Sequence, residues 1–134
     1  MAKLLRPKKK AKKQDLSTVT LGYLHSKHNS FKMKHQRRLK ILFDTGCGAT
    51  FIHHSLVCRF KQKDNKPSNW STKVGSFKTT KSCKVHFTLL AFHYKHNISW
   101  TAYVDNTDKL TSRYDMIIGR ALINELGMTF HLIL

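Results

Sequence analysis

Acidic residues are scarce in this chain of 134 residues, which has seven aspartate and glutamate residues against 25 lysine and arginine residues. Long apolar runs are also missing: no stretch approaches the roughly eighteen residues that a transmembrane helix needs. The lysine-rich start contains no apolar segment of the kind found in a signal peptide. These absences predict that the chain has no transmembrane helix, and we expect a protein that stays inside the cell, in the cytoplasm, without a membrane partner.

Cysteine is rare and irregularly placed. The three cysteines, Cys47, Cys58 and Cys83, are an odd number, which suits reduced thiols better than a disulfide framework. The pair His53-His54 lies close to two of them, but the spacing matches no common zinc finger or knuckle. Adjacent histidines on a strand would also point to opposite faces. We therefore expect no metal site and no cofactor.

Positive charge is concentrated at the start of the chain. Thirteen of the lysine and arginine residues lie within the first forty residues, against Asp15 alone. The run from Arg6 to Lys13 cannot bury anything, so we predict a disordered basic arm over residues 1–17, followed by one domain over residues 18–134. Residues 1–40 could bind nucleic acid non-specifically by counterion release, and the basic run resembles a nuclear-import signal. A solvated tail without a specific partner is an equally good interpretation.

The domain is predicted to be mainly β. Its length and its 40% hydrophobic content support one modest core. Alternating or β-rich stretches predict strands, Lys61 to Ser68 is polar enough to predict a loop, and a single short helix is expected near the end. The predicted strands cover residues 18–24, 39–43, 70–74, 76–80, 84–92, 98–104, 117–118 and 128–134, and the helix covers residues 121–127.

Asp44-Thr45-Gly46 is the most informative tripeptide. It follows the apolar run Ile41-Leu42-Phe43, so a carboxylate lies at the end of a predicted buried strand, and Gly46 allows the backbone to fold closely around it. By itself the tripeptide would also suit an ordinary turn that begins with aspartate. A second motif, Tyr114-Asp115-Met116-Ile117-Ile118-Gly119-Arg120, runs directly into the predicted helix.

Together these two motifs resemble the retropepsins, the aspartic proteases of retroviruses and of gypsy-type LTR retrotransposons, and the retrotransposon branch most closely. The resemblance covers roughly residues 18–132. It implies a retropepsin-like acid protease fold, which is a closed, barrel-like half with a flap hairpin and one short C-terminal helix, assembled as a homodimer. The implied activity is hydrolysis of polypeptides, with polyprotein processing as the expected task.

The resemblance also assigns roles to individual residues. Asp44 corresponds to the catalytic carboxylate, supported in its loop by Thr45 and Gly46. The flap that closes over substrate corresponds to Val74, Gly75, Ser76 and Phe77, and the structural anchor at the dimer base corresponds to Ile118, Gly119 and Arg120.

Peptide hydrolysis by aspartic acids needs two carboxylates, one ionised as general base and one neutral as hydrogen-bond donor. Only one Asp-Thr-Gly occurs here, and no other carboxylate repeats the arrangement of strand, aspartate and glycine. A twofold homodimer would supply the second Asp44. The nucleophile would then be water, with no metal involved.

Some positions depart from the family, and other functions stay open. Cys47 stands where relatives carry a small or hydroxyl residue. Gly48 stands where they carry a carboxylate, and Ala121 stands where they carry a polar residue. An inactive retroelement remnant that acts by interaction alone is therefore an alternative. A nucleic-acid-binding protein is another alternative. It would use the charge of the basic arm, and the aromatic residues Phe31, Trp70 and Phe77 would stack on bases.

Overall fold

The computed structural model describes residues 18–25, 36–72, 74–91, 94–108 and 113–128. Outside these ranges lie the predicted basic arm and Phe31. Of the predicted strand 128–134, only Met128 is described. Within them, no helix is both long enough and apolar enough to cross a membrane.

The described residues form seven strands and two short helices, in an order that confirms a mainly β fold. They are β1 (Thr18–His25), β2 (Gln36–Asp44), β3 (Phe51–His53), α1 (His54–Val57), β4 (Gln62–Thr72), β5 (Gly75–Ala91), β6 (Tyr94–Asp105), β7 (Met116–Gly119) and α2 (Arg120–Glu125).

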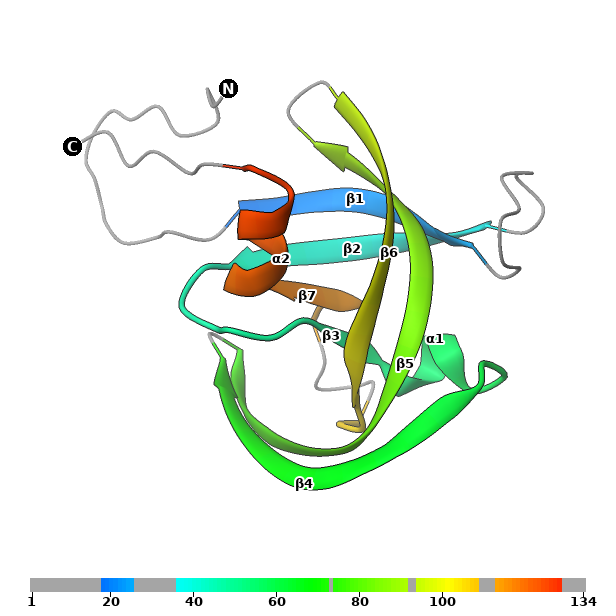
Figure 1. Cartoon of the computed structure of the whole chain (residues 1–134), viewed down its shortest axis with the longest axis vertical. Helices are drawn as coiled ribbons and strands as arrows, with labels where there is room; N and C mark the ends of the chain where they lie inside the picture. Colours follow the sequence, from blue (N-terminus) through cyan, green and yellow to red (C-terminus); the bar gives the residue numbers. More distant parts are fainter. Residues whose placement is uncertain (1–17, 26–35, 73, 92–93, 109–112, 129–134) are drawn as a thin grey trace.

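The sheet closes on itself. Its strand order is β1-β2-β7-β3-β6-β5-β4, and β1 pairs with β5 as well as with β2, so the strands other than β4 form a closed ring. The strand β4 pairs only with the long strand β5, and together they extend away from the ring as a curved hairpin (Figure 1). The predicted hairpin of residues 18–24 and 39–43 is confirmed by the antiparallel register of β1 and β2.

The neighbouring strands β2, β7 and β3 are buried on both faces where they lie side by side. Phe43, Ile52 and Ile118 belong to the main core inside the ring. Their chain neighbours Leu42, Phe51 and Ile117 belong to a second apolar cluster on the opposite face, because successive side chains of a strand alternate. Burial on both faces explains the apolar runs Ile41-Leu42-Phe43 at the end of β2 and Met116-Ile117-Ile118 in β7. Asp44 follows directly after such a strand.

Two local predictions were wrong. Lys61 to Ser68 is not a loop, because most of it belongs to β4, which pairs with β5 from Gln62 to Thr72 with a register shift between Asp64 and Ser68. Its side chains are exposed or half-buried, so backbone pairing with β5, and not an apolar face, makes it a strand. The helix near the end is also not the only one, since α1 forms a single turn after β3.

That turn also changes the arrangement of the two adjacent histidines. His53 ends β3 and His54 begins α1, and their ring centroids lie 4.5 Å apart, so they do not point to opposite faces of a strand. The buried ring of His53 makes hydrogen-bond contacts with the hydroxyl oxygen of Ser55 at 2.8 Å and the carbonyl oxygen of Thr107 at 2.9 Å. It therefore holds the end of β3 in place.

Candidate active site

Asp44 is the last residue of β2, where it lies opposite Gly119 of the parallel strand β7. Only 2% of its surface is exposed. The backbone N–H of Gly46 donates a hydrogen bond to Asp44 Oδ1 at 3.1 Å, and the N–H of Cys47 donates to the Asp44 carbonyl oxygen at 3.1 Å. The loop after β2 therefore turns tightly around this carboxylate.

Helix α2 holds the loop of residues 45–50 through its first N–H groups. No side chain caps the helix, so these donors need other partners. The N–H of Arg120 donates to the Cys47 carbonyl oxygen at 2.6 Å, and that of Ala121 donates to the Gly48 carbonyl oxygen at 3.2 Å. The loop supplies the cap that the helix lacks, and in return the helix fixes the loop.

Gly119 allows this close contact. A Cβ atom at this position would lie 2.1 Å from the Ala49 carbonyl oxygen and 2.7 Å from that of Cys47, distances that no side chain tolerates. The N–H of Gly119 also donates to Thr50 Oγ1 at 3.2 Å. The position therefore needs glycine for steric reasons. Its predicted neighbour in the anchor, Ile118, is fully buried and pairs with Phe43.

The exposed side chain of Arg120 reaches the same loop. Its Nη1 atom donates a hydrogen bond to the Thr45 carbonyl oxygen at 2.9 Å, and a Cβ atom at Gly48 would lie 3.6 Å from its Nη2. Gly48 offers no carboxylate to this guanidinium, and a backbone carbonyl oxygen accepts from it in this chain. Thr45 itself is half-buried and Gly46 is exposed.

The predicted flap residues lie at the tip of the β4–β5 hairpin. Thr72 pairs with Gly75, whose φ of 125° is a conformation that L side chains rarely adopt. The Thr72 hydroxyl donates to the Gly75 carbonyl oxygen at 2.9 Å and accepts from the Val74 N–H at 3.2 Å. Val74 and Ser76 are exposed, which leaves the tip accessible.

The β4–β5 hairpin packs on the second apolar cluster through aromatic side chains. The ring of Phe51 makes edge contacts with Trp70 and Phe77, at centroid distances of 5.2 and 5.0 Å, and the Trp70 ring lies 5.0 Å from Tyr103. Trp70 Nε1 donates to Thr79 Oγ1 at 2.8 Å. Because Cys47 belongs to this cluster, the β4–β5 hairpin and the loop of residues 45–50 share one packed layer. Trp70 and Phe77 are therefore part of the packing of the fold.

A small cavity lies beneath the flap tip. Its volume is about 170 Å³, and it is lined by residues 74–77 together with Asp105, Thr107, Arg113, Tyr114 and Ile117. It brings the predicted flap residues together with the connection between β6 and β7. Asp44 does not line it.

The other described carboxylates near these elements have separate tasks. Asp115 Oδ2 accepts the Lys40 N–H at 2.8 Å, Asp105 Oδ1 accepts the Thr107 N–H at 2.9 Å, and Asp64 pairs with Lys81. Asp105 also ends a strand, β6, and is buried, but no glycine follows it, and its carboxylate is bound within its own turn by the Thr107 N–H. In the described part of the chain, no group of three histidine, cysteine or acidic residues could hold a metal ion.

Two contributors to the site were missed from the sequence. Asp115 ties β7 to β2, because its N–H also donates to the Lys40 carbonyl oxygen at 2.9 Å, and Thr50 accepts the N–H of Gly119. Asp115 could have been found as the polar residue directly before the apolar run of β7. Nothing in the sequence around Thr50 indicated its contact.

Cys47 lies in the loop next to the carboxylate, with 5% of its surface exposed. Burial raises the pKa of its thiol most, and the negative charge of Asp44 raises that pKa further, whereas a hydrogen bond to the backbone of Ala49 and the charge of Arg120 lower it. The net direction is upward, so the thiol stays protonated at neutral pH and is a poor nucleophile.

No protein-family profile and no curated protein sequence matches this chain. Among solved structures, EIAV protease in complex with the inhibitor HBY-793 aligns with 86% of this chain and 92% of its own, with a TM-score of 0.53 and 16% identity. Protein Lpg0085 of Legionella pneumophila, of unknown function, aligns with 84% of this chain and 88% of its own, with a TM-score of 0.48 and 16% identity.

The likeness to EIAV protease establishes the fold. The chain has the mainly β fold of a retroviral aspartic protease, as its two motifs predicted. At 16% identity the likeness concerns the fold alone, and the chemistry of the site is argued below.

Proposed function

We propose that this chain is an aspartic endopeptidase of retroelement origin, active as a homodimer, which cuts polypeptides and whose natural task is polyprotein processing. The observation that carries the proposal is the placement of Asp44. This buried carboxylate ends β2 in a loop of small residues that α2 and Arg120 fix, within the fold of a retroviral aspartic protease.

The dimer is required by the chemistry. Each chain supplies a single carboxylate in this setting, and hydrolysis needs one ionised and one neutral acid. In a twofold dimer the two Asp44 side chains would face each other and share one proton, because two adjacent carboxylates cannot both ionise readily. Thr45 and Gly46 would brace the two loops across the axis, and Arg120 would hold each loop from behind.

The reaction then proceeds without a covalent enzyme intermediate. The ionised Asp44 takes a proton from water as the water oxygen bonds to the peptide carbonyl carbon, and the neutral Asp44 donates a hydrogen bond to the carbonyl oxygen. The proton is next delivered to the departing nitrogen, and the carbon–nitrogen bond breaks. Activity requires one proton on the pair, so it is lost when the pH rises enough to ionise both carboxylates.

The flap would hold the substrate. An extended peptide beneath residues 74–77 could pair with the exposed backbone of the hairpin tip, and the cavity under the tip would accept a side chain. Closure of the flap would exclude water from the reacting atoms. Apolar residues of the second cluster, Phe77 and Ile117 among them, would favour apolar substrate side chains.

The test is cleavage of a mixed peptide library in mildly acidic buffer, read by mass spectrometry. Asp44→Asn removes the base with little change in size, so cleavage should vanish while the circular dichroism spectrum is kept. Asp64→Asn makes the same chemical change at an exposed carboxylate and should cleave like the unaltered chain. Cleavage by Asp44→Asn would exclude the mechanism.

The second candidate function is that of an inactive, retained interaction protein. The departures at Cys47, Gly48 and Ala121 favour it, because they remove polar groups that relatives carry near the dyad. The same library decides between the two. A chain that sediments as a dimer yet cuts no peptide in the library would support this second function.

A further inference from the structure

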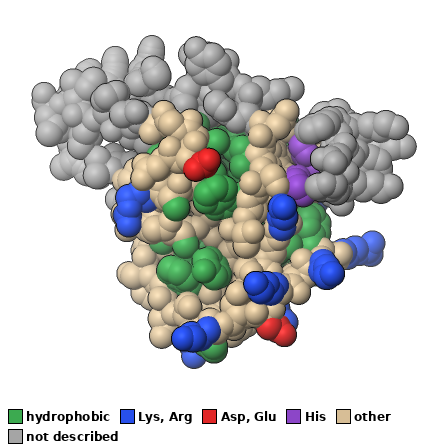
Figure 2. All heavy atoms as spheres, viewed as in Figure 1, with side chains coloured by type: hydrophobic (Ala, Val, Ile, Leu, Met, Phe, Trp, Pro, Cys, Tyr) green, Lys and Arg blue, Asp and Glu red, His purple; other side chains and the backbone are tan. Residues whose placement is uncertain are grey.

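The β4–β5 hairpin and the turn before it carry a concentration of positive charge that proteolysis does not use. Between residues 59 and 84 the only acidic residue is Asp64, and the basic residues are Arg59, Lys61, Lys63, Lys66, Lys73, Lys78, Lys81 and Lys84. On the face drawn in Figure 2, lysine and arginine side chains recur across the surface and acidic ones are few.

Strand register places part of this charge on one face. Lys63 lies opposite Ser82, and Lys84 and His86 follow Ser82 at intervals of two residues, so they share its face. Lys84 in turn lies opposite Thr101 of β6. Asp64 lies opposite Lys81 on the other face, where their side chains form an ion pair of 2.7 Å. Asp64, the one acidic residue of the segment, is therefore paired with Lys81 and lies on the opposite face from Lys63 and Lys84.

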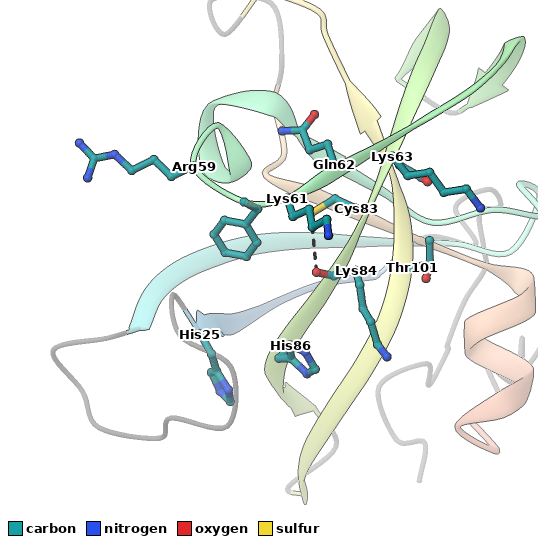
Figure 3. Close-up of a pocket in the computed structure, with 11 residues that line it drawn as sticks. His25, Arg59, Lys61, Gln62, Lys63, Cys83, Lys84, His86 and Thr101 are labelled. Carbon is teal, nitrogen blue, oxygen red and sulfur yellow. Dashed lines mark hydrogen bonds between the residues drawn. The ribbon is translucent and has the colours of Figure 1, made fainter.

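The face is hollowed into a pocket of about 460 Å³ (Figure 3). Its lysine and arginine side chains come from three segments: Arg59 and Lys61 from the turn after α1, Lys63 from β4, and Lys84 from β5; the histidines His25 of β1 and His86 of β5 also line it. Phe60 and Cys83 add apolar surface, and no carboxylate lines the pocket. The volume is in the range of sites that take a small organic ligand.

The pocket lining carries no carboxylate, and the nearby Asp64 is paired with Lys81 outside the pocket. An anion in the pocket would therefore meet Lys61, Lys63 and Lys84 without an acidic side chain competing for them. Lysine, arginine and hydroxyl groups together form the donor set that binds phosphate.

We propose that this pocket binds single-stranded nucleic acid, with backbone phosphates against Arg59, Lys61, Lys63 and Lys84 and one unpaired base inside. The combination of a basic rim with an apolar and aromatic interior favours a nucleotide over an acidic peptide, because glutamate side chains would use the rim alone. A base within a duplex could not enter. The pocket shares no lining residue with the cavity under the flap tip, so the proposal is independent of proteolysis.

The test uses the full chain and a fluorescent oligouridylate in an anisotropy titration over a series of salt concentrations. Lys63→Gln with Lys84→Gln removes two pocket charges. Lys66→Gln with Lys78→Gln removes two exposed charges from the same hairpin outside the pocket, and thermal unfolding checks both folds. Because both double variants keep residues 1–17, any contribution of the basic arm cancels.

The pocket variant should bind about tenfold more weakly, and its slope of log affinity against log salt should fall by about 1.4, since each lost contact to a single strand removes about 0.7. The control should keep nearly the original affinity and slope. Equal losses in both variants would mean attraction by net charge alone and would overturn the proposal.

Lysine acetylation mapped by mass spectrometry gives a second measurement. Oligouridylate should protect Lys61, Lys63 and Lys84 and leave Lys66 and Lys78 reactive. Poly-glutamate of equal charge should compete poorly. If poly-glutamate protects the pocket lysines as well as the oligonucleotide does, the ligand is an acidic polypeptide and the nucleic-acid assignment is wrong.

Discussion

The guanidinium Nη1 of Arg120 donates a hydrogen bond to the carbonyl oxygen of Thr45 at 2.9 Å, which ties helix α2 to the residue directly after Asp44. Two backbone hydrogen bonds from the start of α2 reach Cys47 and Gly48 of the same loop. The position of the carboxylate therefore depends on a helix that lies more than seventy residues further along the chain.

Replacing Arg120 by methionine should loosen this loop. Because the side chain is exposed, the lost hydrogen bond should lower the free energy of unfolding by only about 1 kcal/mol. Peptide cleavage should fall by more than that loss of stability explains, since Asp44 loses its support. Arg37→Met, an exposed arginine on β2, is the control. Thermal unfolding and cleavage rates that stay unchanged in Arg120→Met would contradict the assigned role.

Gly119→Ala should be severely destabilising, because the new Cβ would overlap the carbonyl oxygens of Ala49 and Cys47. Overpacking against backbone costs about 1–3 kcal/mol or more. The matched control is Gly48→Ala, whose Cβ would meet only the Arg120 side chain at 3.6 Å and should change the unfolding free energy by less than about 0.5 kcal/mol. Urea denaturation measures both, and similar midpoints would show that the loop and β7 are less closely packed than described.

Gly75→Ala should separate flap function from stability. Nothing lies within 4 Å of a Cβ atom there, but the φ of 125° would strain any side chain by about 1–3 kcal/mol. The exposed tip should relax locally, so the melting temperature should change little while cleavage falls. Ser71→Ala, an exposed position of the same hairpin, should leave both unchanged. Full cleavage by Gly75→Ala would remove the tip from the mechanism.

The cysteines should differ in reactivity. Burial raises the pKa of both the Cys47 and the Cys83 thiols, so at neutral pH less thiolate is present and access is limited. Cys58 is exposed. Iodoacetamide followed by peptide mapping should therefore modify Cys58 first, and the other two should react only at higher pH or in denaturant. Early modification of Cys47 would show that the Asp44 loop is open.

Much of the site could be predicted because it depends on local chemistry. An apolar run ending in Asp44-Thr45-Gly46 needs little context to predict a carboxylate at a strand end, and the position of Gly75 between two β-capable arms predicted the hairpin. The second motif predicted a helix beginning directly after it, at Ala121, and α2 begins one residue earlier, at Arg120.

The missed features depend on long-range pairing. The stretch from Lys61 to Ser68 has no apolar face, so its own side chains could not indicate a strand, and only hydrogen bonds to β5 make it one. The basic pocket has the same origin, because the register of β4, β5 and β6 brings Lys63, Lys84 and Thr101 together. The pairing of β1 with β5, which closes the ring, likewise could not be predicted from the residues of either strand alone.

The most direct test of the central claim, that two copies of Asp44 form one catalytic pair, is a subunit-mixing experiment. Unaltered chain and Asp44→Asn chain are unfolded, mixed in varied ratios at constant total concentration, refolded, and assayed on a peptide identified from the library. If both carboxylates are needed, only dimers of two unaltered chains cut, so activity should follow the square of the unaltered fraction and fall to about a quarter at equal mixing. Activity that falls in direct proportion to that fraction would show that one Asp44 suffices, and would contradict the account.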